Sequence, residues 1–330
     1  MKYRTLGSSG LNVSSLGFGC GAVGGLLVRG EFSEMVRTVA YAVDSGITYF
    51  DTAALYGNGA SERNLGKVLH ELKPKVVVGT KVRLGGDDLE DIHAAVVSSV
   101  EASLSRLQME RVDLIQLHNP IGPDRDQARG WVTVDDVAIA AEALKDVVQQ
   151  GKAGAWGING LGETKSVHEA LRVSLPQTIQ VCYNLLNPSA ATSVASDFPF
   201  QDYERLFISA NEFNTGIIAI RILAGGALSG VPERHPLGSS EVEPIATSSS
   251  YSADAQRAQS FQVLVDAGHA QSVIEAAIRF AVYTNGPATA LVGISSYEQL
   301  QQAITYVERG PMDGEALSMI RQLSNSNNMK

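Results

Sequence analysis

Cysteine is scarce in this chain of 330 residues, where it occurs only as Cys20 and Cys182. Two cysteines are too few for the disulfide framework of a secreted protein, and these two lack the spacing of metal ligands. We therefore expect two reduced thiols packed in the interior rather than metal ligands.

Positive charge is also in short supply. Lys and Arg together number 26 against 35 Asp and Glu, which gives a net charge of −9. Such a chain has no basic footprint with which to hold a phosphate backbone, so nucleic acid is not an expected partner.

Long apolar runs are missing as well. The most apolar stretch, from Gly216 to Leu228, is interrupted by Arg221 and falls short of the roughly 18 residues that a membrane span requires. The N-terminus leads straight into the turn-rich segment from Leu6 to Gly10, without the apolar region of a signal peptide. We therefore expect a cytoplasmic protein with no membrane partner, and the oligomeric state is left open.

The remaining composition is that of an ordinary globular protein, with 44% hydrophobic and 18% charged residues. Eight short runs rich in β-branched or apolar residues alternate with longer stretches of helical period. The expected strands are Ser15 to Gly19, Ile47 to Asp51, Val76 to Lys81, Leu114 to Leu117, Ala153 to Ile158, Ile179 to Cys182, Gly216 to Ile220 and Ala290 to Gly293. The expected helices lie at about 33–45, 61–70, 90–107, 135–150, 163–174, 202–212, 256–283 and 296–308. The segment from Tyr3 to Ser15 predicts a hairpin ahead of them.

None of these strands shows the strict alternation of a sheet with one solvated face, so both faces are expected to be covered. Eight strand-then-helix units in series predict the α/β class and a closed (β/α)8 TIM barrel, folded as one domain over residues 1–330. A doubly wound open sheet is the alternative. Two connections are unusually long, residues 120–134 after the fourth strand and 229–255 after the seventh. We interpret both as substrate loops, because the loops that follow barrel strands carry the site.

Three titratable residues stand at the ends of neighbouring strands: Asp51, Lys81 and His118. Each would be costly to bury alone, so we expect them to be paired at the barrel mouth. Tyr56 follows Asp51 by five residues, far enough along the loop to fold back over the strand end. A cation such as Lys81 within about 4 to 6 Å would favour the phenolate and bring the pKa of Tyr56 toward the working range. The four residues therefore predict a proton donor with its tuning partners.

The motifs around these residues resemble the signature of the aldo-keto reductases, in particular the bacterial-type, nicotinamide-dependent members. They are the run from Gly46 to Gly57, the pairs Ser61-Glu62 and Leu65-Gly66, and the segments Gly79-Thr80-Lys81 and Asp113 to His118. The resemblance covers nearly the whole chain. It implies a barrel that reduces aldehydes or ketones to alcohols by hydride transfer, with a small-molecule carbonyl substrate and no metal. It also implies that Tyr56 is the general acid and that Lys81 lowers its pKa. Asp51 would pair with Lys81, and His118 would orient the substrate carbonyl.

The resemblance also implies a cofactor site. Gln180 matches the residue that binds the nicotinamide carboxamide, and Asn159 would supply a second amide contact. Arg221, inside an apolar run, should find an anion, either the cofactor pyrophosphate or a substrate carboxylate, with a structural salt bridge as the alternative. The full set of expected cofactor residues is Cys20, Gly21, Asp51, Asn159, Gln180, Ile220, Arg221, Leu223, Gly225, Gly293, Ser295, Ser296, Gln299 and Gln302.

The choice between NADP(H) and NAD(H) depends on the last of these residues. Family members that bind the 2′-phosphate commonly carry a basic residue at the position of Ser296, and they end the motif with Glu and Asn where this chain has Gln302 and Ala303. Hydroxyls of Ser295 and Ser296, with N–H groups at the helix start, could still hold a phosphate. NADP(H) is therefore favoured, with NAD(H) as the alternative. Two other functions stay open: an NAD-dependent aldose dehydrogenase, and a cofactor-binding regulatory subunit without turnover.

Overall fold

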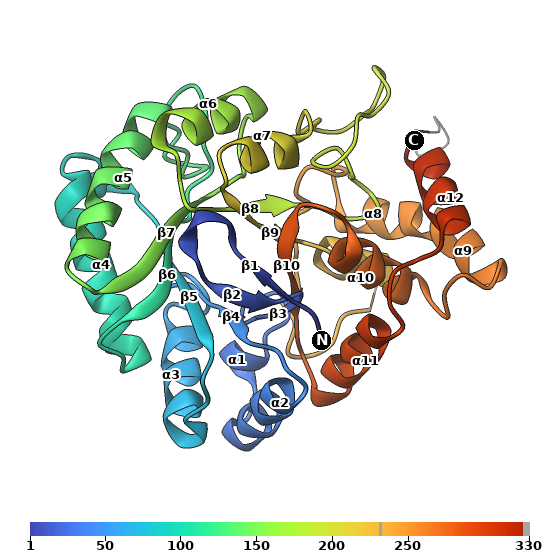
Figure 1. Ribbon diagram of the computed structural model, residues 1–330, viewed down its shortest axis with the longest axis horizontal. Coiled ribbons are helices and arrows are strands. Elements are labelled where there is room, and N and C mark those ends of the chain that lie inside the picture. Colours follow the sequence, from blue (N-terminus) through green and yellow to red (C-terminus); the bar gives the residue numbers. More distant parts are fainter. Residues whose placement is uncertain (231–232, 326–330) are drawn as a thin grey trace.

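A closed barrel of parallel strands forms the centre of the molecule (Figure 1). The computed structural model describes residues 1–230 and 233–325. Within these residues, eight strands follow one another around the barrel in chain order, and the last pairs with the first. The strands are β3 (Leu16–Gly19), β4 (Tyr49–Asp51), β5 (Val77–Val82), β6 (Val112–Leu117), β7 (Ala153–Asn159), β8 (Thr178–Cys182), β9 (Gly216–Ile220) and β10 (Pro287–Gly293). The expected (β/α)8 barrel is confirmed, and the open-sheet alternative is wrong.

The expected N-terminal hairpin is also confirmed, and it lies across the amino-terminal end of the barrel (Figure 1). It consists of β1 (Tyr3–Thr5), the 3-10 turn η1 (Gly7–Ser9) and β2 (Asn12–Ser14). Leu6 and Val13 are buried with Tyr49 and Leu114 of the barrel interior. These apolar side chains close one end of the barrel, so a site has room only at the carboxyl-terminal end.

Helices cover the outer face of the barrel (Figure 1). Those that precede residue 250 are α1 (Leu26–Arg29), α2 (Phe32–Asp44), α3 (Ala60–Leu72), α4 (Ile92–Leu107), α5 (Val134–Gln149), α6 (Thr164–Ser174) and α7 (Leu206–Glu212), with the 3-10 turns η2 (Gly86–Leu89) and η3 (Ala224–Ser229). Those that follow are α8 (Tyr251–Ala258), η4 (Gln259–Phe261), α9 (Gln262–Asp266), α10 (Val273–Tyr283), α11 (Tyr297–Glu308) and α12 (Gly314–Asn325). Over the described ranges, none of the helices combines the length and the apolar character needed to cross a membrane.

The single helix expected over 256–283 is wrong, because the chain there forms α8, η4, α9 and α10. One break falls at Gly268, whose φ of 81° is left-handed, a conformation that ends a helix and that glycine adopts without strain. Ser272 then caps α10 by accepting a hydrogen bond from the N–H of Glu275 at 3.1 Å. The helix expected from residue 202 begins only at Leu206, and the sequence pattern did not indicate α12.

A buried glutamate holds the turn that follows β4. Glu62 on α3 is fully buried, and its carboxylate accepts a hydrogen bond from Thr80 on β5 at 2.6 Å. The same carboxylate pairs with Arg106 on α4 at 2.5 Å. Because α3 is tied to β5 and α4 in this way, the preceding turn, which carries Tyr56, is held at the barrel mouth.

Candidate active site

Four polar side chains meet at the carboxyl-terminal end of three neighbouring strands. Asp51 ends β4, Lys81 lies next to the end of β5, and His118 directly follows β6. These strands are hydrogen-bonded neighbours in the barrel. Tyr56 comes from the turn between β4 and α3, and its hydroxyl lies 3.4 Å from Lys81 Nζ. The structure thus brings together all four residues that we expected to act in catalysis.

Asp51 is the centre of a buried hydrogen-bond network. Its carboxylate forms an ion pair with the ammonium of Lys81, and the side chains are 4% and 1% exposed. The second carboxylate oxygen accepts hydrogen bonds from Tyr49 at 2.9 Å and from Gln180 Nε2 at 2.7 Å. Lys81 also donates to the carbonyl of Thr52 at 2.8 Å. Although burial works against the ammonium, the Asp51 carboxylate raises the pKa of Lys81 above its ordinary value, so Lys81 stays charged.

Two opposing effects set the pKa of the Tyr56 hydroxyl. Burial raises the pKa of Tyr56 above its ordinary value, and the charge of Lys81 offsets this only in part. Lys81 acts in the expected direction, but the loss of water around a phenolate outweighs the nearby ammonium, so the net pKa stays above its ordinary value. Tyr56 is therefore protonated at neutral pH, the state that a proton donor requires.

His118 is a neutral hydrogen-bonding group beside Tyr56. Burial, together with the positive charges of Lys81 and Arg83, holds the pKa of His118 well below its ordinary value. Its ring meets the Tyr56 ring edge-on, with 5.8 Å between the ring centroids. The backbone carbonyl of His118 accepts a hydrogen bond from Asn159 Nδ2 at 3.2 Å. A neutral imidazole carries one N–H donor, which suits contact with a carbonyl oxygen.

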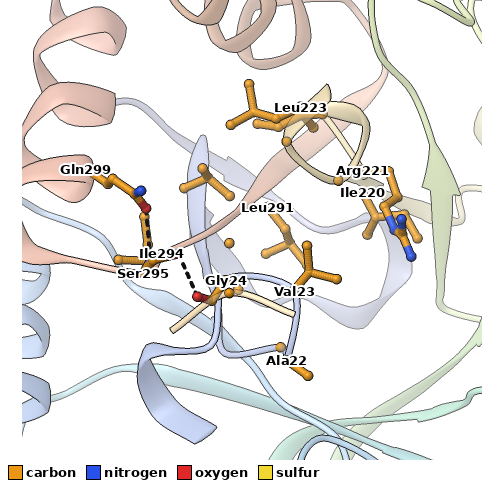
Figure 2. Close-up of a pocket in the computed structure, with 18 of the residues that line it drawn as sticks. Ala22, Val23, Gly24, Ile220, Arg221, Leu223, Leu291, Ile294, Ser295 and Gln299 are labelled. Atoms are coloured by element: carbon orange, nitrogen blue, oxygen red, sulfur yellow. Dashed lines mark hydrogen bonds between the residues drawn. The ribbon is translucent and has the colours of Figure 1, made fainter. Parts of the chain in front are cut away.

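A cavity of about 530 Å³ opens above this cluster. It extends from Asp51, Tyr56 and His118 to α11, and Lys81 lies behind them, outside the described lining residues. In Figure 2, Ile220 and Arg221 lie at one end of the labelled residues, and Ser295 and Gln299 lie at the other. A largely apolar cavity of this size with a few polar groups is typical of a small-molecule site.

Most of the residues expected to hold a cofactor line this cavity. They are Gly21, Asp51, Asn159, Gln180, Ile220, Arg221, Leu223, Gly225, Gly293, Ser295, Gln299 and Gln302. Cys20 and Ser296 are not among the described lining residues. Cys20 is 1% exposed, and its N–H donates to the carbonyl of Asp51 at 2.9 Å. Ser296 is the N-cap of α11. Both cysteines of the chain are buried free thiols, as expected.

One of the two long connections reaches the cavity, as far as the structure describes them. Residues 229–255 contribute Ser229, Glu233, Arg234, His235, Gly238, Ile245 and Tyr251, whereas residues 120–134 contribute none. Positions 231–232 of the 229–255 segment lie outside the described residues. The 120–134 segment packs toward α5, where Arg125 pairs with Asp136 at 2.5 Å. A role for this segment in substrate binding stays a prediction.

Arg221 lines the cavity and has no carboxylate partner in the part of the chain that the structure describes. It follows β9 with a φ of 56°, a conformation that is uncommon for a residue other than glycine. Its Nη1 donates to the backbone carbonyl of Glu243 at 3.0 Å, and no ion pair within the described residues includes it. The alternative of a structural salt bridge is therefore not seen there, and the guanidinium remains suited to bind an anion.

Arg234 is a cavity residue that the sequence pattern did not single out. Its guanidinium donates to the carbonyl of Gly225 at 2.7 Å and to that of Ser239 at 2.6 Å. It also lies 5.0 Å from the centre of the Tyr251 ring. These contacts tie the 229–255 segment to the turn after β9. The only sequence signal was a cation in a long loop after a barrel strand.

Comparisons with known proteins agree with this fold. The model of the Aldo/keto reductase family matches residues 15–325 of this chain. L-galactose dehydrogenase from Arabidopsis thaliana is 28% identical over 331 aligned residues, which cover 98% of this chain and 94% of that protein. Aldo-keto reductase YhdN from Bacillus subtilis (strain 168) is 31% identical over 204 residues, which cover 59% of this chain and 57% of that protein.

Solved structures show the same architecture. The holo form of aldo-keto reductase AKR11C1 from Bacillus halodurans matches with a TM-score of 0.73 and 25% identity, over 98% of this chain and 96% of that chain. Glycerol dehydrogenase AKR11B4 from Gluconobacter oxydans matches with a TM-score of 0.69 and 24% identity, over 95% and 92% of the two chains. The match to glycerol dehydrogenase, at 24% identity, shows the fold alone.

Proposed function

The chain belongs to the aldo/keto reductase family, and from this we propose that it reduces a small aldehyde or ketone to an alcohol with a nicotinamide cofactor and with Tyr56 as proton donor. One observation carries the proposal: the Tyr56 hydroxyl lies 3.4 Å from a buried ammonium, that of Lys81, which Asp51 keeps charged. A protonated group at the floor of a cavity, with a cation positioned to stabilise its conjugate base, meets the needs of general acid catalysis.

The cavity fits the nicotinamide end of such a cofactor. Asn159 Oδ1 is buried with no hydrogen-bond partner within the described residues, so it is available to accept from a carboxamide N–H. Gln180 lies on the adjacent strand, where its bond to Asp51 sets its orientation. Ile220 adds an aliphatic face to the same wall. We assign these three residues to the nicotinamide, which supplies the hydride when it is bound.

The protein's own part is to place the carbonyl group and to deliver a proton. Negative charge grows on the carbonyl oxygen as the carbonyl carbon is reduced, and Tyr56 donates its proton to that oxygen. The neutral imidazole of His118 donates an N–H to the same oxygen and so fixes its position. Lys81 then stabilises the Tyr56 phenolate, while Asp51 holds Lys81 in its protonated state.

A turnover panel tests the proposal directly. NADPH and NADH are each offered with aromatic aldehydes, α-dicarbonyl compounds and aldoses, and kcat/KM is measured for each pair. We expect turnover of at least one carbonyl class in the reductive direction. Binding of a cofactor without turnover of any of them would favour the regulatory-subunit alternative.

The reductive rate should depend little on pH. Tyr56 acts in its protonated form and its pKa is raised, so it begins to lose its proton only in the alkaline range. His118 stays neutral because its pKa is held far below the ordinary value. We therefore expect a flat profile of kcat between about pH 6 and pH 9, measured at saturating cofactor. A kcat that falls through an apparent pKa below about 8 would contradict Tyr56 as the donor.

Arg221 should bind the cofactor pyrophosphate, together with the turn that contains Leu223 and Gly225. Replacing Arg221 by Gln removes a charge-assisted hydrogen bond of roughly 1.5 to 3 kcal/mol, so Kd should rise by about 10- to 100-fold. The increase should be equal for NADH and NADPH, because both contain the pyrophosphate. Arg172→Gln on the exposed side of α6 is the control for net charge. An unchanged Kd with a raised KM for substrates that carry a carboxylate would instead assign Arg221 to the substrate.

Oxidation of a sugar is a second candidate function. A relative that covers 98% of this chain is named L-galactose dehydrogenase. The same four side chains would run the reaction in reverse, with Tyr56 accepting a proton. Because the pKa of Tyr56 is raised, the oxidative rate should increase with pH, in contrast to the flat reductive profile. Rates measured with aldoses and the oxidised cofactor between about pH 6 and pH 9 distinguish sugar oxidation from carbonyl reduction.

A further inference from the structure

The end of the cavity at α11 is lined by neutral side chains. Ser295, Gln299 and Gln302 line it, and no Lys or Arg of the described lining residues comes from β10 or α11. The two arginines of the cavity wall belong to other segments. Arg221 follows β9, at the opposite end of the labelled residues in Figure 2. Arg234 belongs to the 229–255 segment, and its guanidinium donates to the carbonyls of Gly225, Ser239 and, at 3.4 Å, Val23. A phosphate group at the α11 end would therefore find no Lys or Arg on β10 or α11 themselves to give such a contact its strength.

The serine groups that the sequence offered for a phosphate are already used within the protein. Ser295 Oγ donates to the carbonyl of Gly24 at 2.6 Å, and Ser295 N–H donates to Gln299 Oε1 at 2.9 Å (Figure 2). Ser296 Oγ accepts from the N–H of Gln299 at 3.3 Å as the cap of α11. Binding a phosphate through Ser295 would require these bonds to break, because the hydroxyl and the N–H each have a single hydrogen to donate.

A negative charge lies beside these serines. Glu298 is in the first turn of α11, where a hydrogen bond from its own backbone and one from Ser296 lower the pKa of its carboxyl group. The other charged or titratable groups that act on it are Arg37 and His235. Arg37 is already engaged, since it stacks 3.8 Å from the centre of the Tyr297 ring and pairs with a glutamate of its own helix at 3.2 Å. A phosphomonoester, with nearly two negative charges at neutral pH, would be repelled by the Glu298 carboxylate.

We propose that this end of the cavity binds an unphosphorylated adenosine ribose, so that the protein uses NAD(H) in preference to NADP(H). The amide side chains of Gln299 and Gln302 can both donate to and accept from a neutral ribose diol. Resemblance to the family favours NADP(H), but the occupied serines and the Glu298 charge favour the opposite choice. This inference rests on the proposed function, since it takes the cavity to be a nicotinamide-cofactor site.

Direct binding measurements on the full-length protein test the preference without relying on turnover. Kd is measured by calorimetric titration for NADH and NADPH, and for AMP and adenosine 2′,5′-bisphosphate as probes of this end alone. We expect the unmodified protein to bind NADH about 10- to 100-fold more tightly than NADPH, in line with a repulsive contact and no compensating cation on β10 or α11. The bisphosphate should likewise bind more weakly than AMP.

Two variants identify the cause of the expected preference for NADH over NADPH. Ser296→Arg adds a cation at the cap of α11 and should tighten NADPH binding by about 10-fold or more, with NADH little changed. Glu298→Gln removes the nearby charge and should tighten NADPH by a smaller factor of about 2 to 5, because exposed charges are screened by salt. Glu308→Gln removes the same charge from the exposed far end of the helix and should leave both Kd values unchanged.

The outcomes separate this inference from the function it rests on. A protein that binds NADPH as tightly as NADH, or more tightly, contradicts the proposed cofactor choice and leaves the reductase proposal intact. An effect of Glu298→Gln no larger than that of Glu308→Gln removes Glu298 as a determinant. Binding of neither cofactor contradicts the proposed function itself.

Discussion

Replacing Tyr56 by Phe is expected to lower kcat for carbonyl reduction by about 10²- to 10⁴-fold, the contribution typical of a general acid. The aromatic ring, which packs edge-on against His118, is retained in this variant. Only the hydroxyl that faces Lys81 at 3.4 Å is lost. The cavity wall should therefore keep its shape, and the Kd of the cofactor should stay close to that of the unmodified protein.

Single-turnover rates and cofactor titrations on the same preparations check this result. Tyr41→Phe, on α2 outside the barrel, removes an equivalent hydroxyl away from the cavity and should leave kcat unchanged. If the Tyr56 variant kept more than about a tenth of the activity with unchanged cofactor affinity, another group would be the proton donor.

Replacing Lys81 by Met is expected to abolish measurable turnover. The ammonium is the group that lowers the pKa of Tyr56 against the effect of burial, so its loss raises that pKa further and leaves the phenolate without a partner. The change also leaves the Asp51 carboxylate buried without its cation. Removing one partner of a buried ion pair costs about 3 to 5 kcal/mol, so the variant should also unfold at a lower Tm.

A double variant separates the catalytic loss from the loss of stability. Lys81→Met combined with Asp51→Asn removes both charges, and its Tm should therefore exceed that of the single variant. It should remain inactive, because Tyr56 still lacks the neighbouring cation. Recovery of turnover in the double variant would mean that Lys81 serves only to balance Asp51. Circular dichroism melts and kcat measurements on both variants decide the matter.

Local sequence pattern was sufficient to predict the barrel and the cluster of polar side chains at its mouth. Each strand is a short apolar run whose two faces are both covered, and this pattern does not depend on distant residues. The barrel brings the ends of neighbouring strands together by its topology, so Asp51, Lys81 and His118 had to meet once their strands were recognised. Tyr56 is placed by the short turn that follows Asp51. The helix expected over 256–283 failed because its apolar period continues past Gly268, where the backbone turns.

Tertiary structure alone decided the chemical state of these groups. The net pKa of Tyr56 depends on how completely the folded chain excludes water, and no local pattern reports that quantity. The hydrogen bond from Ser295 Oγ to the carbonyl of Gly24 joins residues 271 positions apart. Arg221 donates to the backbone carbonyl of Glu243, in the loop that follows it. The sequence by itself therefore determined that Asp51, Lys81 and His118 reach the barrel mouth, because strand periodicity is local. Long-range contacts and burial decided which of their hydrogen-bond donors and acceptors are free to bind a ligand, and these contacts exist only in the folded chain.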